Sequence, residues 1–66
     1  MNWDQIQGKW KQMKGDLQSE WGQLTDDELA EADGDRERVE GLIQERYGKT
    51  KEEARDAVDN WMKKVS

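Results

Sequence analysis

The residues most able to do chemistry are carboxylates crowded into one short segment. Residues 23–35 hold six acids and no base, whereas the other segments are close to neutral. These six side chains are Asp26, Asp27, Glu28, Glu31, Asp33 and Asp35. Oxygen-rich runs of this kind suit calcium, or the basic groups of a partner protein. We therefore treat the six residues as a candidate interaction face.

A calcium loop of the EF-hand type is excluded by the spacing. Such a loop needs oxygen ligands at positions 1, 3, 5 and 12, with glycine at position 6. Counting from Glu31 puts Arg36 at the glycine position, and counting from Asp35 puts Val39 at position 5. The plainer interpretation is a solvated helix, whose carboxylates near its N-terminus complement the helix dipole.

Other catalytic and binding chemistries also lack their residues. The chain has no His and no Cys, which excludes thiol, imidazole and Ser-His-Asp catalysis and Cys/His zinc sites. We expect no enzyme activity, no cofactor and no metal. Nucleic acid is not an expected partner, because the net charge is −5 and Lys9 and Lys11 lie about 200° apart on a helix.

Apolar residues follow helical spacing through the first third of the chain. The stripe consists of Trp3, Ile6, Trp10, Met13, Leu17 and Trp21. Its spacing of three and four residues predicts one helix over residues 3–21. A helix with Trp on one face and Lys beside it could lie on a membrane surface. The favoured interpretation is that the stripe packs against the other helices, because their apolar stripes also need a partner.

Length and composition limit the size of the protein. The chain has 66 residues, of which 32% are hydrophobic and 41% charged, and its mean hydropathy is −1.36. This material suffices for one small domain, which we place at residues 1–66. No readable secretory signal or membrane-spanning run is present, so we expect a cytoplasmic location. The oligomeric state is left open by the sequence.

The chain repeats itself with a shift of 26 residues. Gly8, Met13, Gly15, Leu17, Gln18, Trp21 and Gly22 fall on Gly34, Val39, Gly41, Ile43, Gln44, Tyr47 and Gly48. Each half has an aromatic–Gly pair, a short turn and a Thr-capped helix. The repeat predicts an all-α protein, a small four-helix bundle built from two repeated helical hairpins.

Helix boundaries follow from the capping residues. Thr25 with Glu28 and Thr50 with Glu53 match the capping box, Asn2 with Gln5 is a weaker match, and Asp33 or Asp35 could cap the third helix. We expect helices at 3–21, 26–33, 36–47 and 51–65. Gly22 and Gly48 are expected to be left-handed helix ends.

Helical wheels separate a core from an outer side. The residues expected to share one core are Trp10, Leu17, Trp21, Leu42, Tyr47, Val58 and Trp61. Gly15 and Gly41 fall on the opposite side of their helices. We expect them to weaken the helices without serving the core, unless a second chain packs closely on them.

These motifs together resemble the CsbD-like family of small bacterial proteins. The resemblance is carried by Gly8-x-Trp10-Lys11-Gln12-x-Lys14-Gly15, Trp21-Gly22-x-Leu24-Thr25-Asp26-Asp27, Gly41-x-Ile43-Gln44-Glu45-Arg46-Tyr47-Gly48, Ala54 and Trp61. It covers nearly the whole chain. The resemblance implies a helical fold, a bacterial cytoplasmic setting and a link to the general stress response. It implies no catalytic residues.

Two functions of different class are compatible with these observations. The first is a hydrophilin-like protectant, which acts by abundance and weak contacts. The second is a specific interaction module, which uses the acidic residues 26–35 for a basic partner protein or the Trp/Lys first helix for a membrane surface. Reversing the charge of residues 26–35 separates the two, because only a specific acidic interface would fail.

Overall fold

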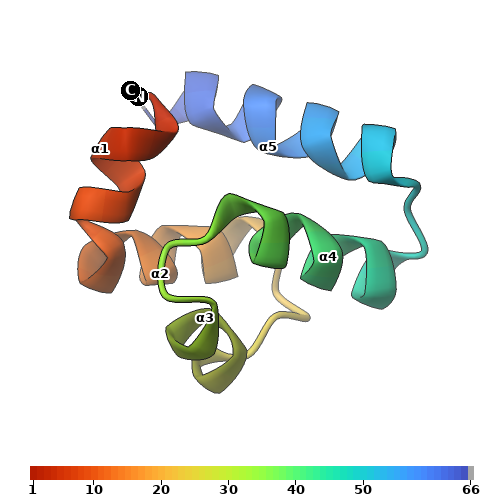
Figure 1. Cartoon of the computed structure of the whole chain (residues 1–66), viewed down its shortest axis with the longest axis horizontal. Helices are drawn as coiled ribbons and strands as arrows, with labels where there is room; N and C mark the ends of the chain where they lie inside the picture. Colours follow the sequence, from red (N-terminus) through yellow and green to blue (C-terminus); the bar gives the residue numbers. More distant parts are fainter. Residues whose placement is uncertain (66) are drawn as a thin grey trace.

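The computed structural model describes residues 1–65, and these form five helices. They are α1 (Trp3–Gly8), α2 (Trp10–Glu20), α3 (Asp26–Ala32), α4 (Arg36–Tyr47) and α5 (Lys51–Lys64), shown in Figure 1. No strand occurs among residues 1–65. The all-α prediction is therefore confirmed, but the predicted number of four helices is wrong.

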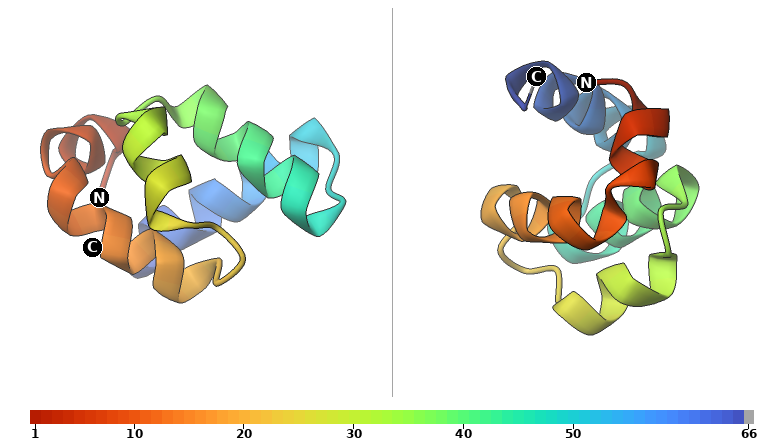
Figure 2. Two further views of the ribbon diagram at one scale, coloured as in Figure 1. Left: turned by 90° about the horizontal axis from the view of Figure 1, so that it is seen from below. Right: turned by 90° about the vertical axis from the view of Figure 1, so that its left-hand side faces the viewer.

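The difference arises at Lys9, where the predicted helix 3–21 breaks into α1 and α2. Lys9 has φ −114° and ψ 32°, and its N–H donates to the carbonyls of Gln5 and Ile6 at 3.1 Å each. Figures 1 and 2 show α1 turned away from the line of α2. The bend brings Trp3 to the α3–α4 turn, where its indole N–H donates to the Gly34 carbonyl at 2.8 Å. Helical spacing alone could not reveal this tertiary contact.

The three predicted capping boxes are present. Asn2, Thr25 and Thr50 begin α1, α3 and α5, and each exchanges hydrogen bonds with the Gln or Glu three residues later. Of the two candidates for capping α4, Asp35 is the N-cap, and its carboxylate accepts from the Glu37 N–H at 3.0 Å. The other candidate, Asp33, ends α3 in the left-handed conformation, with φ 51°.

Only one of the two glycines predicted to be left-handed helix ends has that conformation. Gly48 ends α4 with φ 64°. Gly22 has no positive φ, because α2 ends at Glu20 and its C-cap is Trp21, whose φ is −121° and ψ 82°. This conformation directs the Trp21 side chain into the core, where it is 8% exposed. The prediction for Gly22 is therefore wrong.

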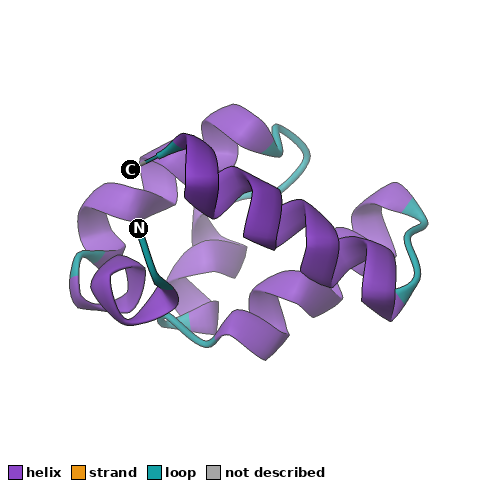
Figure 3. Cartoon of the chain, turned by 90° about the horizontal axis from the view of Figure 1, so that it is seen from above, coloured by secondary structure: helices purple, strands orange, loops and turns teal. Residues whose placement is uncertain are grey.

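The helices enclose one apolar cluster. Seen from above, α5 lies across the other helices (Figure 3), and it returns past α4 in the opposite direction (Figure 1). By contrast, α3 is seen almost end-on in Figure 1 while α2 lies across the view. The helices α2 and α3 thus cross steeply, and the predicted arrangement of two hairpins is not confirmed.

The predicted core residues do share this cluster. Leu17, Trp21, Val58 and Trp61 are buried, and the Trp21 and Trp61 rings lie 5.8 Å apart with a tilted geometry. The remaining three, Trp10, Leu42 and Tyr47, are half-buried and pack against the cluster. The core prediction is therefore confirmed, with four of its residues in the buried cluster and three packed against it.

Candidate functional site

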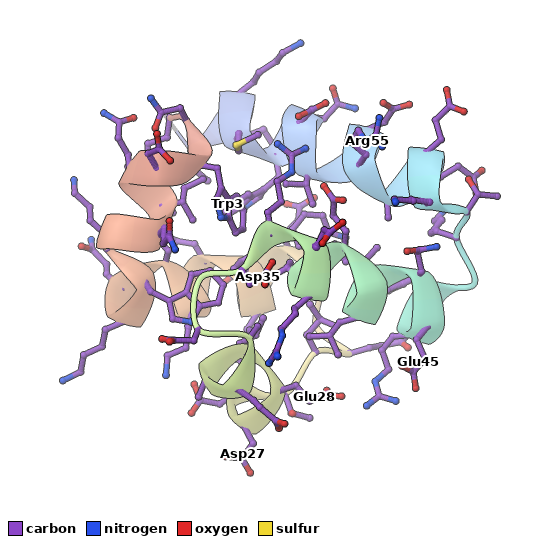
Figure 4. The ribbon with its side chains drawn as sticks, viewed as in Figure 1. Trp3, Asp27, Glu28, Asp35, Glu45 and Arg55 are labelled. Carbon is purple, nitrogen blue, oxygen red and sulfur yellow. The ribbon has the colours of Figure 1, made fainter. Side chains whose placement is uncertain are left out.

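The candidate acidic face lies on α3 and on the turn that leads into α4. Asp26, Asp27, Glu31, Asp33 and Asp35 are exposed, whereas Glu28 is half-buried. Figure 4 shows Asp27 on the outer side of α3, away from the other helices, whereas Asp35 lies at the start of α4. The six carboxylates therefore do not form one continuous face.

Three of the six carboxylates make contacts within the chain. Asp26 pairs with Lys14 of α2 at 3.6 Å, Glu28 pairs with Arg46 of α4, and Asp35 caps α4. Backbone hydrogen bonding from Thr25 is the largest influence on Glu28 and, together with Arg46, lowers the pKa of its carboxyl group. The carboxylates of these three acids are therefore already engaged within the chain.

The other three carboxylates are available. Asp27, Glu31 and Asp33 are exposed, and within residues 1–65 their side chains make no hydrogen bond or ion pair. Asp27 and Glu31 lie four residues apart on α3, so they share a side of that helix. The available part of the predicted face is thus these three residues. Their chemistry is that of weak acceptors for basic groups.

The part of the chain that the structure describes contains no assembled metal-binding site. No group of three or more carboxylates among residues 1–65 comes close enough together to hold a metal ion. The acids of residues 26–35 are spread along α3 and the turn that follows it.

The Trp stripe of α1 and α2 faces inward. Trp3 and Trp10 are half-buried, with their rings 6.0 Å apart, and the Trp10 indole N–H donates to the Leu29 carbonyl at 2.8 Å. No large hydrophobic side chain is exposed anywhere in residues 1–65. In the folded protein the stripe therefore packs in the core, as the favoured interpretation expected. None of the helices described is long and apolar enough to cross a membrane.

A charged network between α4 and α5 was missed by the sequence analysis. Arg36 donates to Glu40 at 2.6 Å, to Asp59 at 2.7 Å and to the Arg55 carbonyl at 3.3 Å. Glu40 is only 6% exposed, so its charge needs this partner. Burial opposes the charge on Arg36, but hydrogen bonds from its guanidinium to Asp59 and Glu40 outweigh burial and raise its pKa. The four-residue spacing of Arg36 and Glu40 was a readable signal.

A groove between α3 and α4 was also missed. It is open, has a volume of about 380 Å³, and is lined by Glu28, Glu31, Ala32, Arg38, Gly41, Leu42 and Glu45. Its floor is small or apolar, and its rim is charged. Arg38 reaches across it, donating to the Glu31 carbonyl at 3.3 Å. The signal in the sequence was the spacing of Arg38, Gly41 and Glu45, which puts them on one side of α4.

Comparisons with known proteins find relatives that match most of the chain. The chain is similar to a UPF0337 protein of Bordetella pertussis, with 59% identity over 58 residues, or 88% of each chain. It is similar to the UPF0337 protein YjbJ of Escherichia coli, with 47% identity over 64 residues, covering 97% of this chain and 93% of that protein. A UPF0337 protein of Pectobacterium atrosepticum is 51% identical over 61 residues, covering 92% of this chain and 88% of that protein.

The family comparison covers most of the helical elements. No solved structure matches the chain. The family model described as CsbD-like matches residues 4–56, which extend from α1 into α5 and include both Thr capping boxes and the α3–α4 groove. With this match and with relatives that are similar over almost their whole length, the chain belongs to the CsbD-like family.

Proposed function

We propose that residues 1–66 form a single domain that acts as a non-enzymatic stress-response protein of the bacterial cytoplasm. Its proposed role is that of a hydrophilin-like protectant, which shields other macromolecules through abundance and weak contacts when water is scarce. The proposed stress-response role and the proposed cytoplasmic location rest on membership of the CsbD-like family. The protectant part rests on the surface of the molecule.

One observation supports the protectant role above the others. No large hydrophobic side chain is exposed in residues 1–65, although the chain contains four Trp residues. The surface therefore consists mainly of charged and polar groups, and the net charge is −5. Such a surface holds water and resists aggregation at high concentration, because like-charged molecules repel each other. A protein that protects others through its high abundance needs both properties.

A second candidate is specific recognition of a basic partner protein by Asp27, Glu31 and Asp33. The supporting observation is that these carboxylates have no partner within residues 1–65. The membrane alternative is less well supported. It would require Trp3 and Trp10 to leave their hydrogen bonds with Gly34 and Leu29 and to expose apolar surface that is now covered.

A drying experiment tests the protectant role. A labile enzyme is dried and rehydrated alone, with this protein, or with an equal mass of an unrelated folded acidic protein. We expect more enzyme activity to survive with this protein than with the unrelated one. Equal survival with the two proteins would contradict the proposal, because the effect would then be that of any acidic protein.

A matched variant separates the two candidates. Asp27→Asn, Glu31→Gln and Asp33→Asn together remove the available charges but keep the size of the side chains, and Asn is tolerated at the left-handed position 33. A protectant should lose little protection in the drying assay. A specific acidic interface should lose its partners, which a pull-down from stressed cells with both versions would show.

A further inference from the structure

The outer side of α4 combines a small residue, a half-buried apolar residue and two opposite charges. Gly41, Arg38 and Glu45 are exposed, and Leu42 is half-buried beside them. All four line the groove between α3 and α4. The groove is open to solvent, and Gly41 is exposed in it.

Gly41 is not explained by the packing of the chain itself. A Cβ built at this position meets no atom within 4 Å, and the residue has no positive φ. Glycine inside a helix weakens it, because glycine loses more backbone freedom on folding than alanine does. A close approach by another backbone would give the missing side chain a use, as it does at tightly packed helix crossings.

The charges on either side of Gly41 are self-complementary. Arg38 lies three residues before Gly41 and Glu45 four residues after it, which is about 4.5 Å and 6 Å along the axis. Both lie within about 60° of Gly41 around the helix. When two such helices cross antiparallel near Gly41, each Arg38 comes beside the partner's Glu45. A two-fold interface requires this kind of self-matching pattern.

The charges of α3 favour the same arrangement. Glu28 and Glu31 line the groove together with Glu45. Arg38 is the single basic residue among the residues that line it. Glu28 is already paired with Arg46, and Glu45 lies 3.9 Å from the same Arg46. A second base is the complementary group for this acidic rim, and a second copy of the chain supplies one at the right place.

We propose that the outer side of α4 binds α4 of a second copy of this chain, antiparallel and crossing at Gly41. In this dimer the Arg38 and Glu45 side chains form two symmetric ion pairs, and the exposed part of Leu42 becomes buried. Two chains of charge −5 repel each other, so the association is weak and is promoted by concentration. The dimer forms at the high abundance that a protectant would reach.

Sedimentation equilibrium in about 0.15 M salt tests the proposal, with protein from about 10 μM to about 1 mM. We expect the average mass to rise above the 7.8 kDa of one chain as concentration increases. A constant mass of one chain over the whole range would overturn the proposal and would leave the groove to a different, basic partner.

Charge exchange identifies the interface. Arg38→Glu or Glu45→Arg alone places like charges opposite each other in both symmetric pairs and should weaken association by about tenfold or more. The double variant with both changes restores opposite charges and should restore association. If the single variants associate as the unchanged protein does, or if the double variant fails to recover, the interface is not on this side of α4. Circular dichroism of each variant verifies that it is folded.

A pair of glycine variants separates association from folding. Gly41→Ala adds a methyl group at the crossing and should weaken the dimer, although the monomer has room for it. Gly15→Ala is the matched control, because a Cβ there also meets no atom within 4 Å and the residue lies on α2. Equal association of these two variants would contradict a crossing at Gly41.

Discussion

Replacing Gly15 with Ala should make the protein more stable. Gly15 lies in the middle of α2, is exposed, and has open space where a Cβ would be. An alanine there loses less backbone freedom on folding, so we expect the free energy of unfolding to rise by about 0.5–1 kcal/mol. A domain of this length has a total stability of about 3–10 kcal/mol. The single change is therefore a measurable fraction of the whole.

The expected shift in melting temperature follows from the size of the chain. An unfolding entropy of about 2.1 cal/mol/K per residue corresponds to about 0.14 kcal/mol/K for 66 residues. The stabilisation then raises Tm by about 4–7 °C. Urea melts followed by circular dichroism should show a higher midpoint with an unchanged slope. Lower stability of Gly15→Ala would refute the reasoning, since it would mean that the glycine lies in a close contact.

Other glycines provide controls for this reasoning. Gly48→Ala should lower the stability by about 1–2 kcal/mol, because its φ of 64° is strained for a residue with a Cβ. Gly34→Ala should lower it further, because φ is 81° and the added Cβ would lie 2.7 Å from Cγ of Gln7. Gly22→Ala should be nearly neutral, since Gly22 has no positive φ and its Cβ would lie 4.0 Å from the Gln18 carbonyl.

Three further predictions concern the core, metal binding and pH. Trp emission should be blue-shifted in the native protein and should shift to the red in urea, because Trp21 and Trp61 are buried; an emission maximum like that of free Trp in buffer would contradict this core. Calcium should bind residues 26–35 no more tightly than magnesium does, and a micromolar calcium affinity in a titration would contradict the expectation. The pKa values of Glu28 and Glu53 are lowered from 4.5, chiefly by hydrogen bonds from the Thr25 and Thr50 backbones. Their stabilisation is therefore present above pH 4.5 and is lost as pH falls through the lowered values. Glu53→Gln keeps a capping side chain but cannot titrate, so its urea midpoint should fall less between pH 6 and pH 3; an unchanged pH dependence would count against this role.

Most of the secondary structure was predictable from the sequence because its signals are local. A capping box involves residues three apart, so Thr25 and Thr50 identified the starts of α3 and α5 without any knowledge of the rest of the chain. The apolar stripes identified the core for a similar reason, because side chains three and four residues apart share a helix face. Trp61 and Val58 are buried as this pattern requires.

The break between α1 and α2 had a signal that periodicity concealed. Gly8 matches Gly34 under the shift of 26 residues, and Gly34 follows directly after the left-handed residue that ends α3. The same repeat therefore indicated an interruption near Gly8. The regular spacing from Ile6 to Trp10 favoured a continuous helix instead. Apolar residues keep the same spacing when the chain bends toward its packing partner, so the spacing does not reveal the break.

The sequence located the candidate site, and the structure shows how its carboxylates are arranged and paired. Composition located the acidic excess in residues 23–35. It could not show that Glu28 pairs with Arg46, or that Asp26 pairs with Lys14, because each pair joins two different helices and depends on how those helices pack. Only Asp27, Glu31 and Asp33 remain available in the described part of the chain.

Sequence alone thus determined which residues become helical, where most helices begin and which side chains are apolar enough to be buried. These properties depend on neighbours within one or two helical turns, so short sequence patterns are enough to predict them. The tertiary structure alone decided how α1 bends, how steeply α2 and α3 cross, and which charges are neutralised across helices. Those outcomes depend on contacts between residues such as Trp3 and Gly34, or Arg36 and Asp59, which are brought together only when the core forms.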